Sequence, residues 1–187
     1  MLSMNQLALL QERLNLGFER SGRALQRALS SADLRLEVRE LRCRAMADFS
    51  PDSLCGGGDV AAGVVLRFDG GLRGTALFAM EPEAALGLAR GGGPDREPIA
   101  FFTELGGTVL SELLLGTTEG LDRDSEMGPP QLEESSLMAI MASTHAPSDT
   151  LILTMRADLV ARDRERDAFD VHLMLEPKLL HGLLGEA

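Results

Sequence analysis

Residues 61–82, AAGVVLRFDGGLRGTALFAMEP, contain two short apolar runs that are joined by DGGLR and followed by MEP. Short runs of this kind, rich in Val, Leu and Phe and separated by glycines, predict a β-hairpin. A second pair of runs, TLILTMRADL (150–159) and AFDVHLMLEP (168–177), has the same form and ends in LEP. Because proline is favourable in the first turn of a helix, MEP and LEP each predict a short helix directly after a hairpin.

A long amphipathic helix precedes each hairpin. Apolar residues recur every three or four positions over residues 5–30 and again from Pro98, where the predicted apolar stripe begins at Ile99. Glu12 matches Glu104 at an offset of 92 residues, and MEP matches LEP at an offset of 95. The order helix, variable connection, hairpin and short helix therefore occurs twice, which predicts two half-repeats, about 1–95 and 96–187.

Each half is too small to bury a sheet alone. We therefore expect one α+β domain, residues 1–187, in which two halves related by a pseudo-two-fold axis share a largely antiparallel sheet. The two long helices carry the equivalent motif positions. The remaining patterns predict a strand at 33–41, a loop at 51–59, a helix at 131–144 and a C-terminal helix at 178–187.

Composition excludes several classes of protein. Hydrophobic residues make up 44% of the chain, enough for a substantial core, and the formal net charge is −11. Such an acidic chain is repelled by phosphate backbones and anionic membranes, so we expect no nucleic-acid partner. The N-terminus has no secretory pattern and no run reaches the length of a membrane span, which predicts a cytoplasmic protein without membrane insertion.

The two long helices differ in one polar position. Glu12 and Asn15 are three residues apart, so both side chains lie on the helix face opposite the apolar stripe. In the second helix Glu104 has the equivalent place, but Gly107 stands where Asn15 stands in the first. Because glycine has no side chain with which to orient a substrate, we expect the second site to be degenerate.

These features resemble the CheC-type family of response-regulator phosphatases (CheC, CheX and FliY). That family carries a Glu-x-x-Asn signature on each of two pseudo-symmetric long helices. The segment Glu12-Arg-Leu-Asn15-Leu-Gly17 resembles the first copy, and Glu104-Leu-Gly-Gly107 resembles a second copy that lacks its Asn. The resemblance extends over nearly the whole chain in the same order of elements. Family motifs usually have Asp or Ser four residues before the Glu, where this chain has Ala8 and Ala100.

The resemblance implies hydrolysis of the aspartyl phosphate on a CheY-like receiver domain in chemotaxis or a related two-component pathway. Asn15 would hold the attacking water, since a carboxamide both donates and accepts hydrogen bonds without being ionised. Glu12 would anchor the helix to a receiver lysine. No cofactor of the protein's own is expected, because the Mg²⁺ would be supplied by the receiver.

Other interpretations remain open at this point. A relative without catalysis would use the same fold to dock a receiver, a flagellar switch component or the deamidase CheD. A homodimer through sheet edges is possible in such a fold. Two further alternatives are that Glu12 and Asn15 form an ordinary solvated helix face, and that the chain is an unrelated α+β domain with a chance motif. The histidines have no metal-ligand spacing, so no metal site is expected, and His172 is predicted to be half-exposed on a strand.

Overall fold

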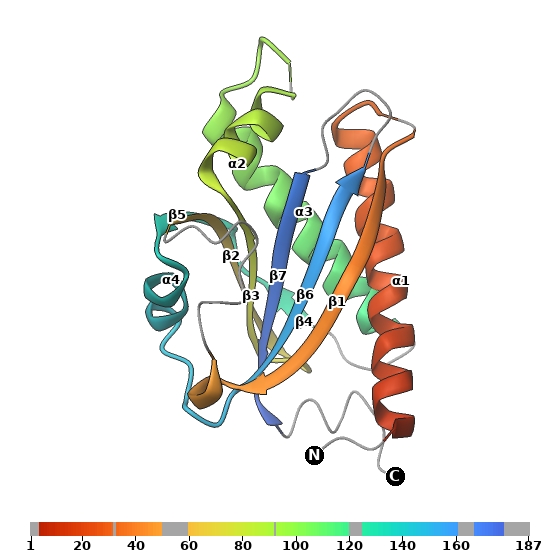
Figure 1. Ribbon diagram of the computed structural model, residues 1–187, viewed down its shortest axis with the longest axis vertical. Coiled ribbons are helices and arrows are strands. Elements are labelled where there is room, and N and C mark those ends of the chain that lie inside the picture. Colours follow the sequence, from red (N-terminus) through yellow and green to blue (C-terminus); the bar gives the residue numbers. More distant parts are fainter. Residues whose placement is uncertain are drawn as a thin grey trace.

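The computed structural model describes residues 4–31, 33–49, 60–91, 93–119, 125–160 and 167–177 (Figure 1). The helices are α1 (Met4–Ala28), α2 (Pro82–Arg90), α3 (Pro98–Thr117) and α4 (Leu137–Ser143), with a 3₁₀ turn, η1 (Met46–Asp48). The strands are β1 (Arg35–Ala45), β2 (Ala61–Gly70), β3 (Gly74–Met80), β4 (Ser125–Met127), β5 (Gln131–Ser135), β6 (Leu151–Val160) and β7 (Asp167–Leu175). Both hairpins and both long helices are therefore confirmed.

All seven described strands belong to one antiparallel sheet. Its order is β1-β6-β7-β3-β2-β4, and β5 pairs with the same strand, β2, as β4 does. The two hairpins meet at the centre through β3 and β7. The strands that precede each hairpin pair with the hairpin of the other half. Strand β1 of the first half pairs with β6, and strands β4 and β5 of the second half pair with β2. This exchange is how two half-repeats form the single shared sheet that the sequence predicts.

Helices α1 and α3 cross on one face of this sheet and enclose the main core with it (Figure 1). The crossing is too close for ordinary side chains at two positions. A Cβ atom on Gly17 would lie 2.4 Å from the carbonyl oxygen of Leu113, and one on Gly116 would lie 2.5 Å from the Cα of Gly17. At equivalent positions of the two helices, Arg20 Nε and Glu112 Oε2 lie 3.0 Å apart. Glycine thus lets the two long helices pack backbone to backbone.

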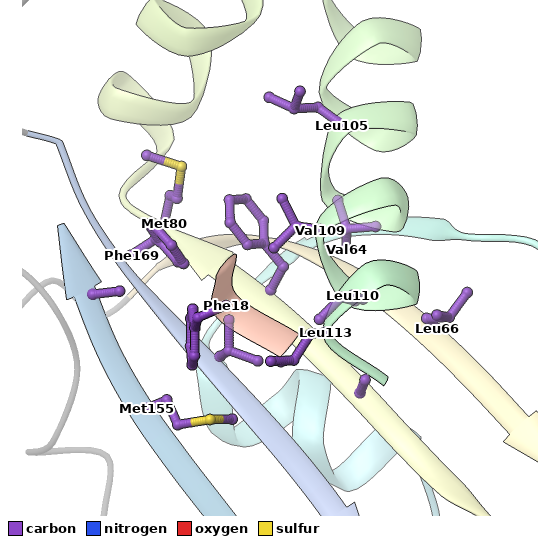
Figure 2. Close-up of a cluster of buried hydrophobic side chains, with 14 of the residues drawn as sticks. Phe18, Val64, Leu66, Met80, Leu105, Val109, Leu110, Leu113, Met155 and Phe169 are labelled. Atoms are coloured by element: carbon purple, nitrogen blue, oxygen red, sulfur yellow. The ribbon is translucent and has the colours of Figure 1, made fainter. Parts of the chain in front are cut away.

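The core beneath the crossing is made of aliphatic and aromatic side chains from both halves. Figure 2 shows several of them lying between the helices and the strands: Phe18, Val64, Leu66, Met80, Leu105, Val109, Leu110, Leu113, Met155 and Phe169. Burial of such side chains contributes roughly 1.5–3 kcal/mol each relative to exposure. A smaller cluster on the opposite face of the sheet lies under α4.

Helix α3 is long and apolar enough to cross a membrane, with a mean hydropathy of 1.4, but 56% of that window is buried inside the protein. Its buried side includes Leu105, Leu110 and Leu113, which belong to the main core. This burial identifies α3 as a core helix.

Two local predictions are wrong. The helix predicted at 131–144 begins only at Leu137, where the Ser136 hydroxyl caps it by accepting from the Ala139 N–H group. The preceding residues form β5 because their backbone pairs with the free edge of β2. Ile99 is 61% exposed, and Phe101 is buried instead, with the Arg96 guanidinium above its ring. The loop predicted at 51–59 and the helix predicted at 178–187 lie outside the described residues.

Candidate functional site

The predicted polar pair lies on the exposed side of α1. Glu12 and Asn15 are both exposed, whereas Leu14 and Phe18 on the opposite side are buried in the core. Within the described part of the chain, Glu12 has no ion-pair partner and the Asn15 carboxamide makes no hydrogen bond. Both side chains are therefore available to a partner molecule. Ala8, one turn before Glu12, is also exposed.

Asn15 lines an open groove between α1 and β1. Two adjoining hollows of about 720 and 160 Å³ form this groove, and both are lined by Asn15, Phe18 and Val38. Phe18 is buried while Val38 is 40% exposed, so the carboxamide lies beside an apolar floor that solvent reaches. Near apolar surface, water competes less for the hydrogen bonds that a carboxamide offers. The groove is large enough to receive part of another protein's surface.

A β-bulge in β1 shapes the wall of this groove. Val38 pairs with Ala157 and Glu40 pairs with Arg156, so Arg39 is the extra residue of the bulge. The Arg39 guanidinium reaches the buried carboxylate of Asp158, with Nη2 and Oδ2 2.5 Å apart. An extra residue reverses the alternation of a strand. For this reason Val38 and Leu41, three residues apart, both line the groove beside α1.

The equivalent position on α3 is closed. Gly107 is buried, and a Cβ atom placed on it would lie 2.8 Å from both Cβ and Cγ of Pro130. Pro130 belongs to the short segment that separates β4 from β5, the strand pair at the edge near α3. Its ring therefore fills the space that an asparagine side chain at this position would need. Glu104 is exposed, and its Oε2 lies 4.0 Å from Nη1 of Arg96.

The predicted exposure of His172 is wrong. Its side chain is fully buried on the sheet face opposite α1 and α3, with Nδ1 3.0 Å from Thr154 Oγ1 and the Phe49 ring against it. Desolvation is the main cause that lowers its pKa to about 4, and nearby Arg156 also lowers it, while Asp170 acts in the opposite direction. The imidazole is thus neutral at physiological pH. Among the described residues, no group of three or more His, Cys, Asp or Glu side chains is placed to hold a metal ion.

Sequence reasoning placed Glu12 and Asn15 on one exposed helix face but missed the groove wall and Pro130. The wall depends on the bulge at Arg39, and the spacing of apolar residues in the sequence does not indicate a β-bulge. The adjacent prolines 129 and 130 are visible in the sequence as a break in secondary structure. Their distance of more than 20 positions from Gly107 gives no sign that one of them packs against it.

Comparisons with known proteins give a fold but no sequence family. No protein-family model and no curated protein matches the chain. Thermotoga maritima FliY superposes with a TM-score of 0.77 at 13% identity, covering 98% of this chain and 96% of that one. A chain of the FliG–FliM complex from H. pylori gives 0.68 at 11% identity, with 97% and 100% covered. A chain of the CheX–CheY–BeF₃–Mg²⁺ complex from Borrelia burgdorferi gives 0.52 at 14% identity, with 86% and 96% covered. The arrangement of helices and strands described above is therefore the CheC/CheX/FliY-type fold, and this chain has it.

Proposed function

We propose that the protein is a single-site phosphatase that hydrolyses the aspartyl phosphate of a CheY-like receiver domain in the cytoplasm. The observation that carries this proposal is the difference between the two motif positions. Asn15 opens onto a solvent-accessible groove without a hydrogen-bond partner among the described residues, whereas Gly107 lies beneath Pro130. The CheX–CheY complex among the structures of this fold supports a receiver as substrate.

The role assigned to α1 is to position the attacking water molecule. An acyl phosphate is already activated, so hydrolysis requires a water molecule held in line with the bond from phosphorus to the aspartyl oxygen. The Asn15 carboxamide oxygen accepts a hydrogen bond from that water, and its NH₂ group donates to a phosphoryl oxygen. Water attacks phosphorus, the bond to the carboxylate oxygen breaks, and free carboxylate and inorganic phosphate are released. The receiver's own Mg²⁺ neutralises charge on the phosphoryl oxygens.

Glu12 is assigned to docking. It lies one helical turn before Asn15 on the same exposed side and has no ion pair with any described residue. A free carboxylate beside the catalytic amide is suited to pair with a cationic side chain of the receiver, which fixes the helix in one register. We therefore expect loss of Glu12 to weaken receiver binding and loss of Asn15 to slow the chemical step.

The test is the lifetime of a phosphorylated CheY-like receiver from the same genome, measured with wild-type protein, Asn15→Ala and Asn5→Ala. Asn5 is a matched control because it is an exposed asparagine on the same helix. Wild type and Asn5→Ala should shorten the lifetime, while Asn15→Ala should restore it to within about twofold of the receiver alone, because positioning of the water accounts for most of the acceleration. Folded wild-type protein that leaves the lifetime of every such receiver unchanged would refute the phosphatase.

A second candidate is a non-catalytic docking module for a receiver, a flagellar switch component or CheD. The FliG–FliM complex among the structures of this fold, with a TM-score of 0.68, supports this candidate. The two functions separate in one experiment. A docking module binds the phosphorylated receiver without shortening its lifetime, and Asn15→Ala then changes neither quantity beyond about twofold.

A further inference from the structure

Charge is distributed very unevenly along this acidic protein. Residues 13–44, which run from the middle of α1 to the end of β1, contain eight arginines and four acidic residues, a formal charge of +4. The rest of the chain contains ten basic and 25 acidic residues, a formal charge of −15. The region that carries Asn15 is therefore the basic part of a protein whose remaining surface repels anions.

Two arginines of this region line the larger hollow of the groove. Arg23 comes from α1 and Arg35 from β1, and both are exposed. Arg35 has no ion pair with any described residue, while Arg23 meets only Glu19 across 3.5 Å of exposed surface. Exposed pairs of this kind contribute well under 1 kcal/mol, so a partner's carboxylate can replace Glu19 at little cost. These two guanidinium groups are thus accessible to an anionic partner.

Apolar side chains lie among these charges. Val38 on the β1 wall is 40% exposed, and the buried Phe18 of α1 lines the same hollow. An exposed apolar centre with a charged rim is the usual composition of a protein-binding surface. The groove lies between α1 and β1, which are neighbours at one edge of the molecule (Figure 1).

We propose that this basic groove is a second contact for the receiver, selective for acidic side chains that surround the phosphorylated aspartate. The inference rests on the proposed function, because it takes Asn15 as the point that reaches the phosphoryl group. Arg23 follows Asn15 by eight residues, about 12 Å along a helix. A cognate receiver therefore presents carboxylates roughly 12 Å from its phosphorylation site, and receivers without them bind weakly.

Arg39 also lines the groove but is unsuitable for a test, because its removal would leave the buried Asp158 carboxylate without this ion pair. The informative variant is Arg23→Glu with Arg35→Glu. The matched control is Arg67→Glu with Arg90→Glu, which makes the same change in net charge. Arg67 and Arg90 are exposed and have no ion pair among the described residues. Both double variants retain Asn15 and Glu12.

The experiment measures the affinity of each protein for the BeF₃⁻–Mg²⁺-loaded receiver between about 50 and 300 mM salt. Charge reversal at 23 and 35 should weaken binding about tenfold or more at low salt and flatten its salt dependence, while the control stays within about twofold of wild type. Equal binding by the two double variants would overturn the basic groove and leave the phosphatase intact. Wild type that binds no receiver would overturn the proposed function and this contact with it. Salt-sensitive binding of duplex DNA through Arg23 and Arg35 in place of the receiver would also overturn it.

Discussion

The Asn15 side of α1 and the Gly107 side of α3 hold equivalent places in the two half-repeats, yet only one of them is open. Beside α1, the edge strand β1 is interrupted by a bulge at Arg39, and a groove remains between helix and strand. Beside α3, the edge strand is interrupted by the segment that separates β4 from β5, and Pro130 lies against the helix. Both halves have the long helix and its neighbouring edge strand, but only the first half has space beside the helix for a polar side chain.

This difference shows that the glycines of the two motif regions have separate causes. Gly17 follows the first motif because the helices cross there, and the crossing is part of the fold. Gly107 lies under a residue from another segment, so a side chain there would meet Pro130 and not the other long helix. Substitutions at Gly17 therefore test the crossing of the two long helices, and substitutions at Gly107 test the contact with Pro130.

The largest effect is expected from Gly17→Ala. The added methyl group would meet the Leu113 carbonyl oxygen, which is fixed in α3 and cannot move away cheaply. We expect the free energy of unfolding to fall by about 2–4 kcal/mol in urea titration, at the upper end of overpacking effects. Gly22→Ala is the control on the same helix, since its Cβ would meet only Leu36 Cγ at 3.8 Å. That change should be neutral or stabilising by up to about 1 kcal/mol. Similar losses for both variants would mean that the crossing is not the reason for Gly17.

A second difference between the halves lies at the centre of the sheet. His172 of β7 pairs with Leu77 of β3, its equivalent at the offset of 95 residues. Burial lowers the folded-state pKa of His172 to about 4, below the ordinary value of 6.5. Between these values the unfolded chain binds more protons than the folded one, so stability is lost as pH falls from about 6.5 toward 4.

His172→Leu, which copies the first half, removes this dependence. Between pH 7 and 5 the wild type should lose about 2 kcal/mol of unfolding free energy through this histidine, at about 1.4 kcal/mol per pH unit. The variant should lose less by that amount, while carboxylates shared by both proteins contribute equally. Urea titrations at the two pH values measure the difference. Parallel pH profiles for the two proteins would show that the imidazole titrates normally and is not desolvated.

Much of this architecture is predictable from local pattern. The hairpins, the long helices and the repeat follow from apolar spacing, from Pro82 and from the matching offsets. Features made by contacts between distant segments are not predictable in this way. Residues 131–135 become a strand because β2 offers an unpaired edge, and His172 is buried by elements outside its own strand. The exposure of Asn15 follows from the helical period of the apolar residues. Gly107 is covered by Pro130 of another segment, and no periodic pattern in the sequence relates these two residues.

The contact between the Pro130 ring and Gly107 can be tested by substitution. Gly107→Asn alone should destabilise the protein by about 1–2 kcal/mol, because its Cβ would lie too close to the Pro130 ring. Pro130→Gly removes both contacting atoms, so the double variant should show a favourable coupling of about 1 kcal/mol or more in a double-mutant cycle. Additive losses would indicate that Pro130 does not close the position. A second phosphatase site that appears in the double variant, and is absent from Pro130→Gly alone, would be the sharpest evidence that α3 retains the geometry of α1.

The smallest effect is expected from Asn15→Ala on stability. Asn15 is exposed, has no hydrogen bond to any described residue, and occupies a mid-helix position where alanine is preferred by up to about 0.7 kcal/mol. The free energy of unfolding should therefore stay the same or rise slightly, measured by urea titration beside Asn5→Ala. This result matters because truncating a side chain that supports the fold lowers the free energy of unfolding of the protein. Truncating a side chain that serves only a partner does not. If Asn15→Ala instead destabilises the protein by more than about 1 kcal/mol, the side chain has a structural role, and an altered receiver lifetime in that variant could no longer be assigned to lost positioning of water.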